Sequence, residues 1–103
     1  MIARVWHGRA LIANADAYAR HFHTEVLPEL ERLDGFGGAS LLRREGDDGI
    51  VEFMAITRFD SLEAVRAFAG SDYERAVVAS TARDLLLDFD ERVKYYVETG
   101  GSD

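Results

Sequence analysis

The strand predicted at Ile50–Phe59 constrains the fold more than any other part of the sequence, because it is apolar on both faces. Side chains alternate between the two faces of a β-strand. One face carries Val51, Phe53, Ala55, Thr57 and Phe59, and the other carries Ile50, Met54 and Ile56 beside Glu52 and Arg58. A strand with this pattern is buried on both sides, so we expect it inside a sheet whose two faces are both covered.

Two helix signals follow this strand. Asp60 and Glu63 have the spacing of a capping box, in which the first side chain accepts a hydrogen bond from a free backbone N–H group and the second reaches back. Ser71 and Glu74 repeat this spacing, and Gly70 between the two boxes predicts a helix end. The segment therefore predicts two consecutive helices.

The other elements follow from β-branched residues, apolar periodicity and turn residues. A long helix is capped by Asn14 and ends before Gly35, and Pro28 is expected to kink it because proline lacks a backbone donor. Gly37 and Gly38 predict a bulge near the start of the second strand. The predicted strands are 2–8, 36–44, 50–59 and 89–98, the predicted helices are 14–34, 61–69 and 73–87, and residues 45–49 form a hairpin turn.

This β-α-β-β-α-α-β order is that of a ferredoxin-like split βαβ fold of the α+β class, with the second helical leg broken in two. Right-handed crossovers give a four-stranded antiparallel sheet in the order 4-1-3-2, with the helices on one face. We expect a single domain over residues 1–98 and a flexible tail at 99–103, since 103 residues allow one core and not two.

The helices of such a fold cover only one face of the sheet. In the first strand we place His7 and Val5 toward the helices, and the alternate side chains on the open face. The open face would expose an apolar patch too large for a monomer, so we expect a second copy of the chain to close it, giving a two-fold dimer with packed sheets. The expected contact residues are Arg4, Trp6, Glu52, Met54 and Ile56, with Arg4 and Glu52 pairing across adjacent strands.

Composition argues against several classes of function. A net charge of −7 without any run of lysine or arginine argues against nucleic-acid binding. The chain has no cysteine, which removes disulfides, thiolate nucleophiles and cysteine metal sites, and no other metal-ligand spacing occurs. There is no signal-peptide core and no apolar run near the roughly 20 residues that span a bilayer, so we expect a cytoplasmic protein without membrane contact.

The histidines differ in their predicted surroundings. His21 and His23 are two residues apart on a helix, so they point apart and cannot chelate one metal ion. We expect His21 to be solvated and both side chains to have ordinary packing or surface roles. His7, if it faces the space between sheet and helices, is the candidate general base. The alternative is a hydrogen-bonded histidine at a strand end.

Aromatic residues recur where the sheet is expected to meet the helices. Tyr18 and Tyr73 are the candidates for hydroxyl groups that orient a substrate, and Phe22, Phe53 and Phe68 are candidate substrate-binding walls of a flat apolar cavity. Ordinary core packing is the alternative explanation of the same aromatic spacing. Trp6 is expected to anchor the dimer.

The stretches RVWHG at 4–8, GFGGA at 35–39, the segment 51–74, and FDERV with YYV at 89–97 resemble the antibiotic biosynthesis monooxygenase-like (ABM) group of the dimeric α/β-barrel superfamily. The resemblance covers nearly the whole chain. It implies a dimeric α/β barrel and, in the quinol-oxidising members, oxygenation without a cofactor. Those members imply an Asn and a Trp on the helix after the third strand, where this chain has Phe68 and neither residue, while Tyr73 could match their tyrosine. Haem-degrading members imply a later histidine, and none follows His23.

Two functions remain open on these observations. The first is a cofactor-independent monooxygenase that acts on a flat aromatic or quinone-like small molecule. The second is a non-catalytic dimeric module that binds a ligand or only assembles. A solvent-connected cavity bordered by His7, Tyr18 and Tyr73 would favour the enzyme, and a filled interface would favour the module.

Overall fold

Three long antiparallel strands form the centre of the sheet. The computed structural model describes residues 1–101, in which β1 (Ile2–Leu11) pairs with β3 (Ile50–Phe59), and β3 pairs with β2 (Phe36–Glu45). The other side of β1 pairs with two short strands, β4 (Asp88–Phe89) and β5 (Lys94–Val97). The predicted antiparallel order 4-1-3-2 is therefore confirmed, with the last strand divided into two pieces.

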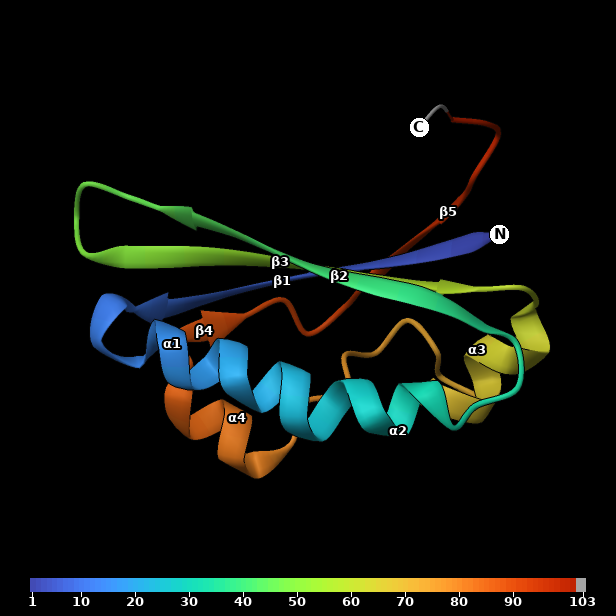
Figure 1. The fold of residues 1–103 in the computed structure, drawn as a ribbon, viewed down its shortest axis with the longest axis horizontal. Helices are drawn as coiled ribbons and strands as arrows, with labels where there is room; N and C mark the ends of the chain where they lie inside the picture. The colour runs from blue at the N-terminus through green and yellow to red at the C-terminus, as the bar shows by residue number, and fades with distance from the viewer. Residues whose placement is uncertain (102–103) are drawn as a thin grey trace.

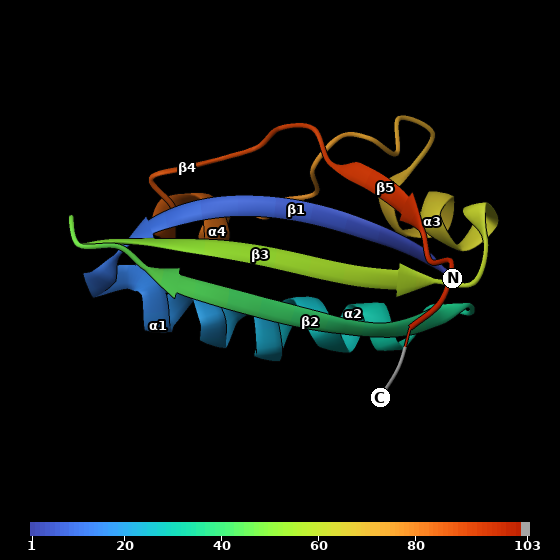
Figure 2. The same ribbon diagram turned by 90° about the horizontal axis from the view of Figure 1, so that it is seen from above.

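The helices all lie on one side of this sheet (Figure 1). Viewed from the opposite side, the sheet has no element above it (Figure 2). The helical elements are α1 (Ile12–His21), a π-helical turn η1 (Phe22–Val26), α2 (Leu27–Glu31), α3 (Leu62–Ala69) and α4 (Ser80–Leu85). The fold is thus the predicted two-layer, ferredoxin-like α+β arrangement with one covered face and one open face.

The first helix begins two residues before the predicted cap Asn14, and no side chain caps it. The predicted irregularity at Pro28 takes the form of the π-helical turn η1, in which the Leu27 N–H donates to the carbonyl of Phe22. Proline removes one donor from the helical ladder, and a wider turn just ahead of it redistributes the remaining bonds. Gly35 has the predicted positive φ of 86°, but the helix ends earlier than predicted, at Glu31 and not at Asp34.

The second helical leg differs most from prediction. Ser61, and not Asp60, caps α3, since its side chain accepts a hydrogen bond from the N–H of Ala64 at 3.1 Å. Gly70, with φ of 84°, ends α3 as predicted. The predicted cap at Ser71 is wrong, because residues 71–79 are irregular and α4 begins only at Ser80.

Residues 74–76 pair with residues 91–93 instead of continuing a helix. The N–H of Ala76 donates to the carbonyl of Glu91 at 2.8 Å, and the N–H of Val93 donates to the carbonyl of Glu74 at 2.7 Å. These bonds satisfy the backbone of both segments. The same pairing engages residues 91–93 in place of β1, while the N–H of Asp90 still donates to the His7 carbonyl at 3.0 Å, so the predicted strand 89–98 is split into β4 and β5.

The register between β1 and β3 reverses the predicted faces of β1. Trp6 lies opposite Ala55 and His7 lies opposite Met54. Because directly paired residues share a face, Arg4 and Trp6 point toward the helices, whereas Val5 and His7 lie on the open face. The predicted dimer contacts of Arg4 and Trp6, and the Arg4–Glu52 pair, are therefore wrong.

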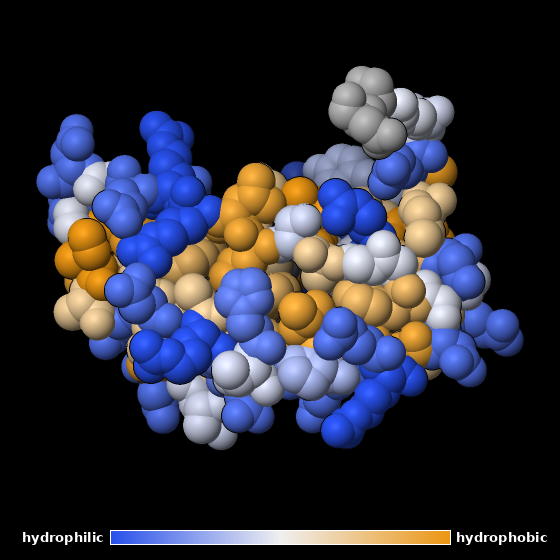
Figure 3. All heavy atoms as spheres, in the orientation of Figure 1, coloured by the Kyte–Doolittle hydropathy of each residue, from blue (hydrophilic) through white to orange (hydrophobic). Residues whose placement is uncertain are grey.

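The core lies between the sheet and the helices in two clusters. One is centred on Trp6, Tyr18 and Phe53, and the other on Leu30, Phe59 and Val65. On the side of the molecule seen in Figure 3, hydrophobic atoms extend across the middle and reach the upper edge at the centre, with hydrophilic atoms on both flanks and below. No helix of the described residues is long and apolar enough to cross a membrane. The domain limits remain a prediction, and residues 102–103 of the predicted tail lie outside the described part of the chain.

Candidate functional site

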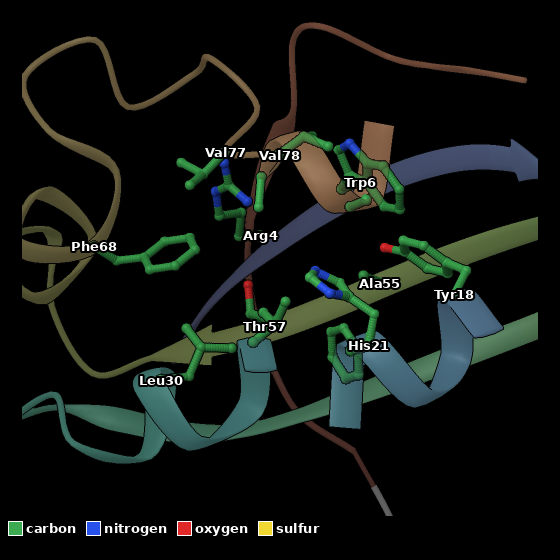
Figure 4. A pocket seen from close by; sticks show the side chains of 14 residues that line it. Arg4, Trp6, Tyr18, His21, Leu30, Ala55, Thr57, Phe68, Val77 and Val78 are labelled. Atoms are coloured by element: carbon green, nitrogen blue, oxygen red, sulfur yellow. The ribbon is translucent and has the colours of Figure 1, made fainter. Parts of the chain in front are cut away.

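A cavity lies between the covered face of the sheet and the helices (Figure 4). It has an inner volume of about 50 Å³ and adjoins an outer hollow of about 440 Å³, with which it shares His21, Val26, Phe68, Val77 and Ala79. The outer hollow is in the size range of small-molecule sites, whereas the inner part has room for only one edge of a ligand. The cavity is therefore open toward the surface between η1 and the segment 77–79.

Trp6 forms one inner wall. Its side chain is 6% exposed, and its ring stacks on that of Tyr18 with the centroids 5.9 Å apart. The indole lies directly over Gly8, since a Cβ placed on Gly8 would be 2.3 Å from the indole Cη2 atom. Glycine at this position lets the indole lie flat along β1, which shapes the wall.

The first helical segment supplies Tyr18, His21 and Phe22, whose i, i+3, i+4 spacing places them on one side of the helix. His21 is the last residue of α1 and lies just before the π-helical turn. In Figure 4 its ring and the Tyr18 hydroxyl both point into the cavity. Burial raises the pKa of Tyr18, because the phenolate would be poorly solvated there.

Arg4 closes the inner end of the cavity and is 5% exposed. Its Nε donates to the Tyr95 hydroxyl and its Nη2 donates to the Arg75 carbonyl, both at 3.0 Å. The guanidinium also lies 5.1 Å from the centre of the Phe68 ring. Burial lowers the pKa of Arg4, and Tyr95 acts in the opposite direction.

Three buried polar atoms at this cavity have no hydrogen-bond partner among the described residues. They are Trp6 Nε1, His21 Nε2 and Thr57 Oγ1. They come from β1, α1 and β3 respectively. Buried polar atoms are nearly always paired, so three unpaired ones around a single cavity make this cavity the candidate site.

The structure brings together only half of the predicted site. Tyr18, Phe22 and Phe68 line the cavity as predicted. Phe53 lies behind Tyr18, with the ring centres 4.9 Å apart, and is not in the lining. Tyr73 packs edge-on against Tyr95 outside the cavity and contributes its carbonyl, not its hydroxyl, to the surrounding hydrogen bonds.

The predicted placement of His7 is wrong. On the open face, its Nδ1 lies 3.6 Å from a carboxylate oxygen of Asp90, which also pairs with Arg9 at 3.3 Å. His7 borders a separate hollow of about 150 Å³ with Val5 and Lys94. It therefore cannot act on a molecule held in the cavity between sheet and helices.

Sequence reasoning missed Arg4, Thr57 and His21 as lining residues. Arg4 was assigned to the wrong face, and His21 was predicted to be solvated. The i, i+3, i+4 relation among Tyr18, His21 and Phe22 was a usable signal for His21. The described residues contain no group of three or more histidine, aspartate or glutamate side chains placed to hold a metal ion.

Comparisons with known proteins identify the fold. No family model matches the sequence, and no curated protein matches it. Among solved structures, it is similar to a Bacillus cereus protein described as a candidate antibiotic biosynthesis monooxygenase, with a TM-score of 0.69 and 17% identity over 99% of this chain and 94% of that one. It is also similar to Rv0793 of Mycobacterium tuberculosis, with a TM-score of 0.62 and 17% identity over 99% of this chain and 98% of that one.

A third similar structure is the monooxygenase from the ActVA-Orf6 gene of Streptomyces coelicolor, determined in complex with nanaomycin D. The TM-score is 0.68 and the identity 16%, over 98% of this chain and 89% of that one. At these identities the likeness concerns the fold. The chain therefore has the antibiotic biosynthesis monooxygenase-like fold.

Proposed function

We propose that this protein is a cofactor-independent oxygenase that binds a flat phenolic or quinone-like molecule between its sheet and its helices. The fold supports this function, because one protein of similar structure is a monooxygenase determined with nanaomycin D bound. The aromatic walls of the cavity support a flat ligand. Because α3 lacks the Asn and Trp that the resemblance implies, this function requires other side chains to carry the chemistry.

The observation that carries the proposal is the set of unpartnered polar atoms. Leaving a buried polar atom without a partner costs about 1–3 kcal/mol. Trp6, His21 and Thr57 each leave one such atom at the same cavity. A ligand with polar groups at its edge, inserted from the outer hollow, would satisfy these atoms while its flat body lies against Phe68 and His21.

We assign the general base to His21, in place of His7. In an anthrone, a proton moves from the methylene carbon to His21 Nε2, and the resulting anion is delocalised over the rings. The anion gives one electron to oxygen, and the two radicals join through a new C–O bond. Loss of water then leaves a carbonyl, so that CH₂ and O₂ become C=O and H₂O. Burial favours the neutral Tyr18, whose hydroxyl would donate a hydrogen bond to the substrate oxygen.

Aerobic turnover of an anthrone and quinol panel, followed by oxygen uptake, tests this function. His21→Gln should lower kcat/KM by about 10²–10⁴-fold, the usual contribution of a positioned base. His23→Gln is the matched control, because His23 is exposed two residues away, and His7→Ala is a second control on the open face. Equal rates in wild type and His21→Gln would remove His21 from the mechanism.

The second candidate, a ligand-binding module without turnover, is favoured by the absence of the family's Asn and Trp from α3. Trp6 is the single tryptophan of the chain and lines the cavity, so its fluorescence reports binding. Quenching by the aromatic panel without oxygen uptake would support the module. Oxygen uptake that depends on His21 would support the enzyme.

We also propose that the open face forms a two-fold homodimer. Val5, Met54 and Ile56 lie there half-exposed, with Leu42 beside them. Charges of both signs, including Glu52, flank these side chains, so two copies could pair face to face. Light scattering at micromolar concentration should give twice the monomer mass, and Met54→Lys should reduce it. A monomer-sized wild type would contradict the dimer.

A further inference from the structure

Arg4 is a buried cation that pairs with no anion in the described part of the chain. It is 5% exposed and forms no ion pair with any carboxylate of the described residues, whereas Arg9, Arg43, Arg58 and Arg92 all lie near carboxylates. A buried charge is strongly disfavoured unless an opposite charge or a full set of hydrogen bonds compensates it. The described residues therefore leave the positive charge of Arg4 without a compensating negative charge.

Tyr95 does not supply the missing charge. Its hydroxyl oxygen accepts the hydrogen bond from Arg4 Nε and donates its own proton to the Tyr73 carbonyl at 2.5 Å. A tyrosinate could not make that second bond. Burial raises the pKa of Tyr95, with Arg4 acting in the opposite direction, so the neutral phenol is the form that the surroundings favour. Within residues 1–101, the guanidinium is thus hydrogen-bonded only to neutral groups.

The free part of the guanidinium borders the cavity. Nε and Nη2 are used by Tyr95 and Arg75, while Nη1 donates to no group among the described residues. Figure 4 shows the Arg4 head group on the cavity wall beside Val77 and Val78, facing the Phe68 ring. Thr57, whose hydroxyl is unpartnered, lies opposite Arg4 on the neighbouring strand. Two adjacent strands therefore present polar groups at one spot.

We propose that the ligand of this cavity carries a carboxylate and that Arg4 binds it. This inference rests on the proposed function only in taking the cavity as the ligand site. Guanidinium and carboxylate match in shape and charge, and such charge-assisted bonds are the strong ones in proteins. Thr57 Oγ1 can donate a further hydrogen bond to the same group.

The carboxylates at the mouth of the cavity set the direction in which the ligand enters. Glu25 and Glu29 border the outer hollow and are exposed. They repel a carboxylate left at the mouth, whereas Arg4 attracts one at the inner end. The inner cavity of about 50 Å³ is large enough for such a group and too small for an aromatic ring system. The acidic group therefore leads, and the flat body of the ligand remains in the outer hollow.

Calorimetric titration with two matched probes tests the inference. Anthraquinone-2-carboxylate carries the anion, and 2-(hydroxymethyl)anthraquinone is its neutral counterpart. Wild type should bind the carboxylate at least about tenfold more tightly, as expected for a charge-assisted hydrogen bond. Both probes are already oxidised at the reacting carbons, so a failure of turnover would leave this result unaffected.

Variants assign the preference to Arg4. Arg4→Met should bind both probes alike, and Arg4→Lys should keep part of the preference. Arg43→Met is the matched control, because Arg43 lies on the same face of the sheet over Phe53 and is paired with Asp16. If Arg4→Met does not fold, the test is the ratio of the affinities for the two probes, compared between wild type and Arg4→Lys. Equal affinities in wild type, a full preference in Arg4→Met, or binding of neither probe would overturn the inference, and only the last would also contradict the proposed function.

Discussion

The charged groups of the open face and the buried polar groups at the inner end of the covered face differ in whether they have partners. On the open face, Arg9 and His7 lie against carboxylates of the segment 88–90, within reach of solvent. At the inner end of the covered face, Arg4 pairs with no carboxylate of residues 1–101, and the Thr57 hydroxyl has no hydrogen-bond partner among them. Charges that are paired and partly solvated need nothing further. Buried polar groups without partners are uncommon, which is why we propose the ligand site on the covered face.

The largest expected effect concerns packing. Phe59→Ala on the covered face should lower the free energy of unfolding by about 3–5 kcal/mol, because Phe59 is fully buried. Leu42→Ala on the open face is the control, since Leu42 is 47% exposed, and should cost less than half as much. Denaturant unfolding measures both. Equal losses would mean that the two faces are buried alike.

Whether the sequence predicts which side chains lie on which face of the sheet depends on the register between β1 and β3. The alternation in Ile50–Phe59 correctly assigned every side chain of β3 to its face. The faces of β1 could not be assigned, because a shift of the pairing by one residue exchanges them and both sets contain polar and apolar side chains. The prediction therefore placed His7 at the site and Trp6 at the dimer contact, and the structure reverses both.

Tertiary contacts explain a second difference between prediction and structure, which is the irregular segment 71–79 in place of a helix start. The spacing of Ser71 and Glu74 is that of a helix start, yet residues 74–76 bond to residues 91–93. Val77 and Val78, which are β-branched, weaken helix formation locally. The pairing with the C-terminal segment depends on where that segment lies in the fold, and no local pattern contains that information. The pairing of residues 74–76 with residues 91–93 also brings the segment 77–79 to the cavity.

The shape of the cavity wall is expected to depend on Gly8. Gly8→Ala should lower the free energy of unfolding by about 1–3 kcal/mol, because the added carbon would overlap the Trp6 indole and displace it. The emission of Trp6 should shift as well. Gly101→Ala is the control, because no atom lies within 4 Å of a Cβ there. An unchanged emission spectrum and stability in Gly8→Ala would mean that the indole does not lie over Gly8.

The buried phenol predicts a loss of stability in alkali. Burial raises the pKa of Tyr18, so the unfolded state loses the proton at lower pH than the folded state. Stability should be intact below the unfolded value of about 10 and should fall above it, by up to about 1.4 kcal/mol per pH unit from this group. Tyr18→Phe should reduce that slope and the exposed Tyr96→Phe should not. Unfolding curves from neutral to alkaline pH give the dependence of the free energy of unfolding on pH. Identical slopes for wild type and Tyr18→Phe would contradict the burial of the Tyr18 hydroxyl.

The smallest expected effect distinguishes two neighbouring residues at the end of β3. Ser61→Ala should lower the free energy of unfolding by about 1 kcal/mol, since its side chain caps α3. Asp60→Ala should cost less, because no hydrogen bond from its side chain to α3 is present in the described residues. Thermal unfolding of the two variants compares them. A larger loss for Asp60→Ala would support the capping box predicted from the sequence.

A crystal structure of the protein with anthraquinone-2-carboxylate would show which face of the sheet binds the ligand. We expect the ligand between the sheet and the helices, with its carboxylate on Arg4 and its rings against Phe68 and His21. A ligand bound instead on the open face beside His7 and Asp90 would contradict the claim that the covered face holds the site.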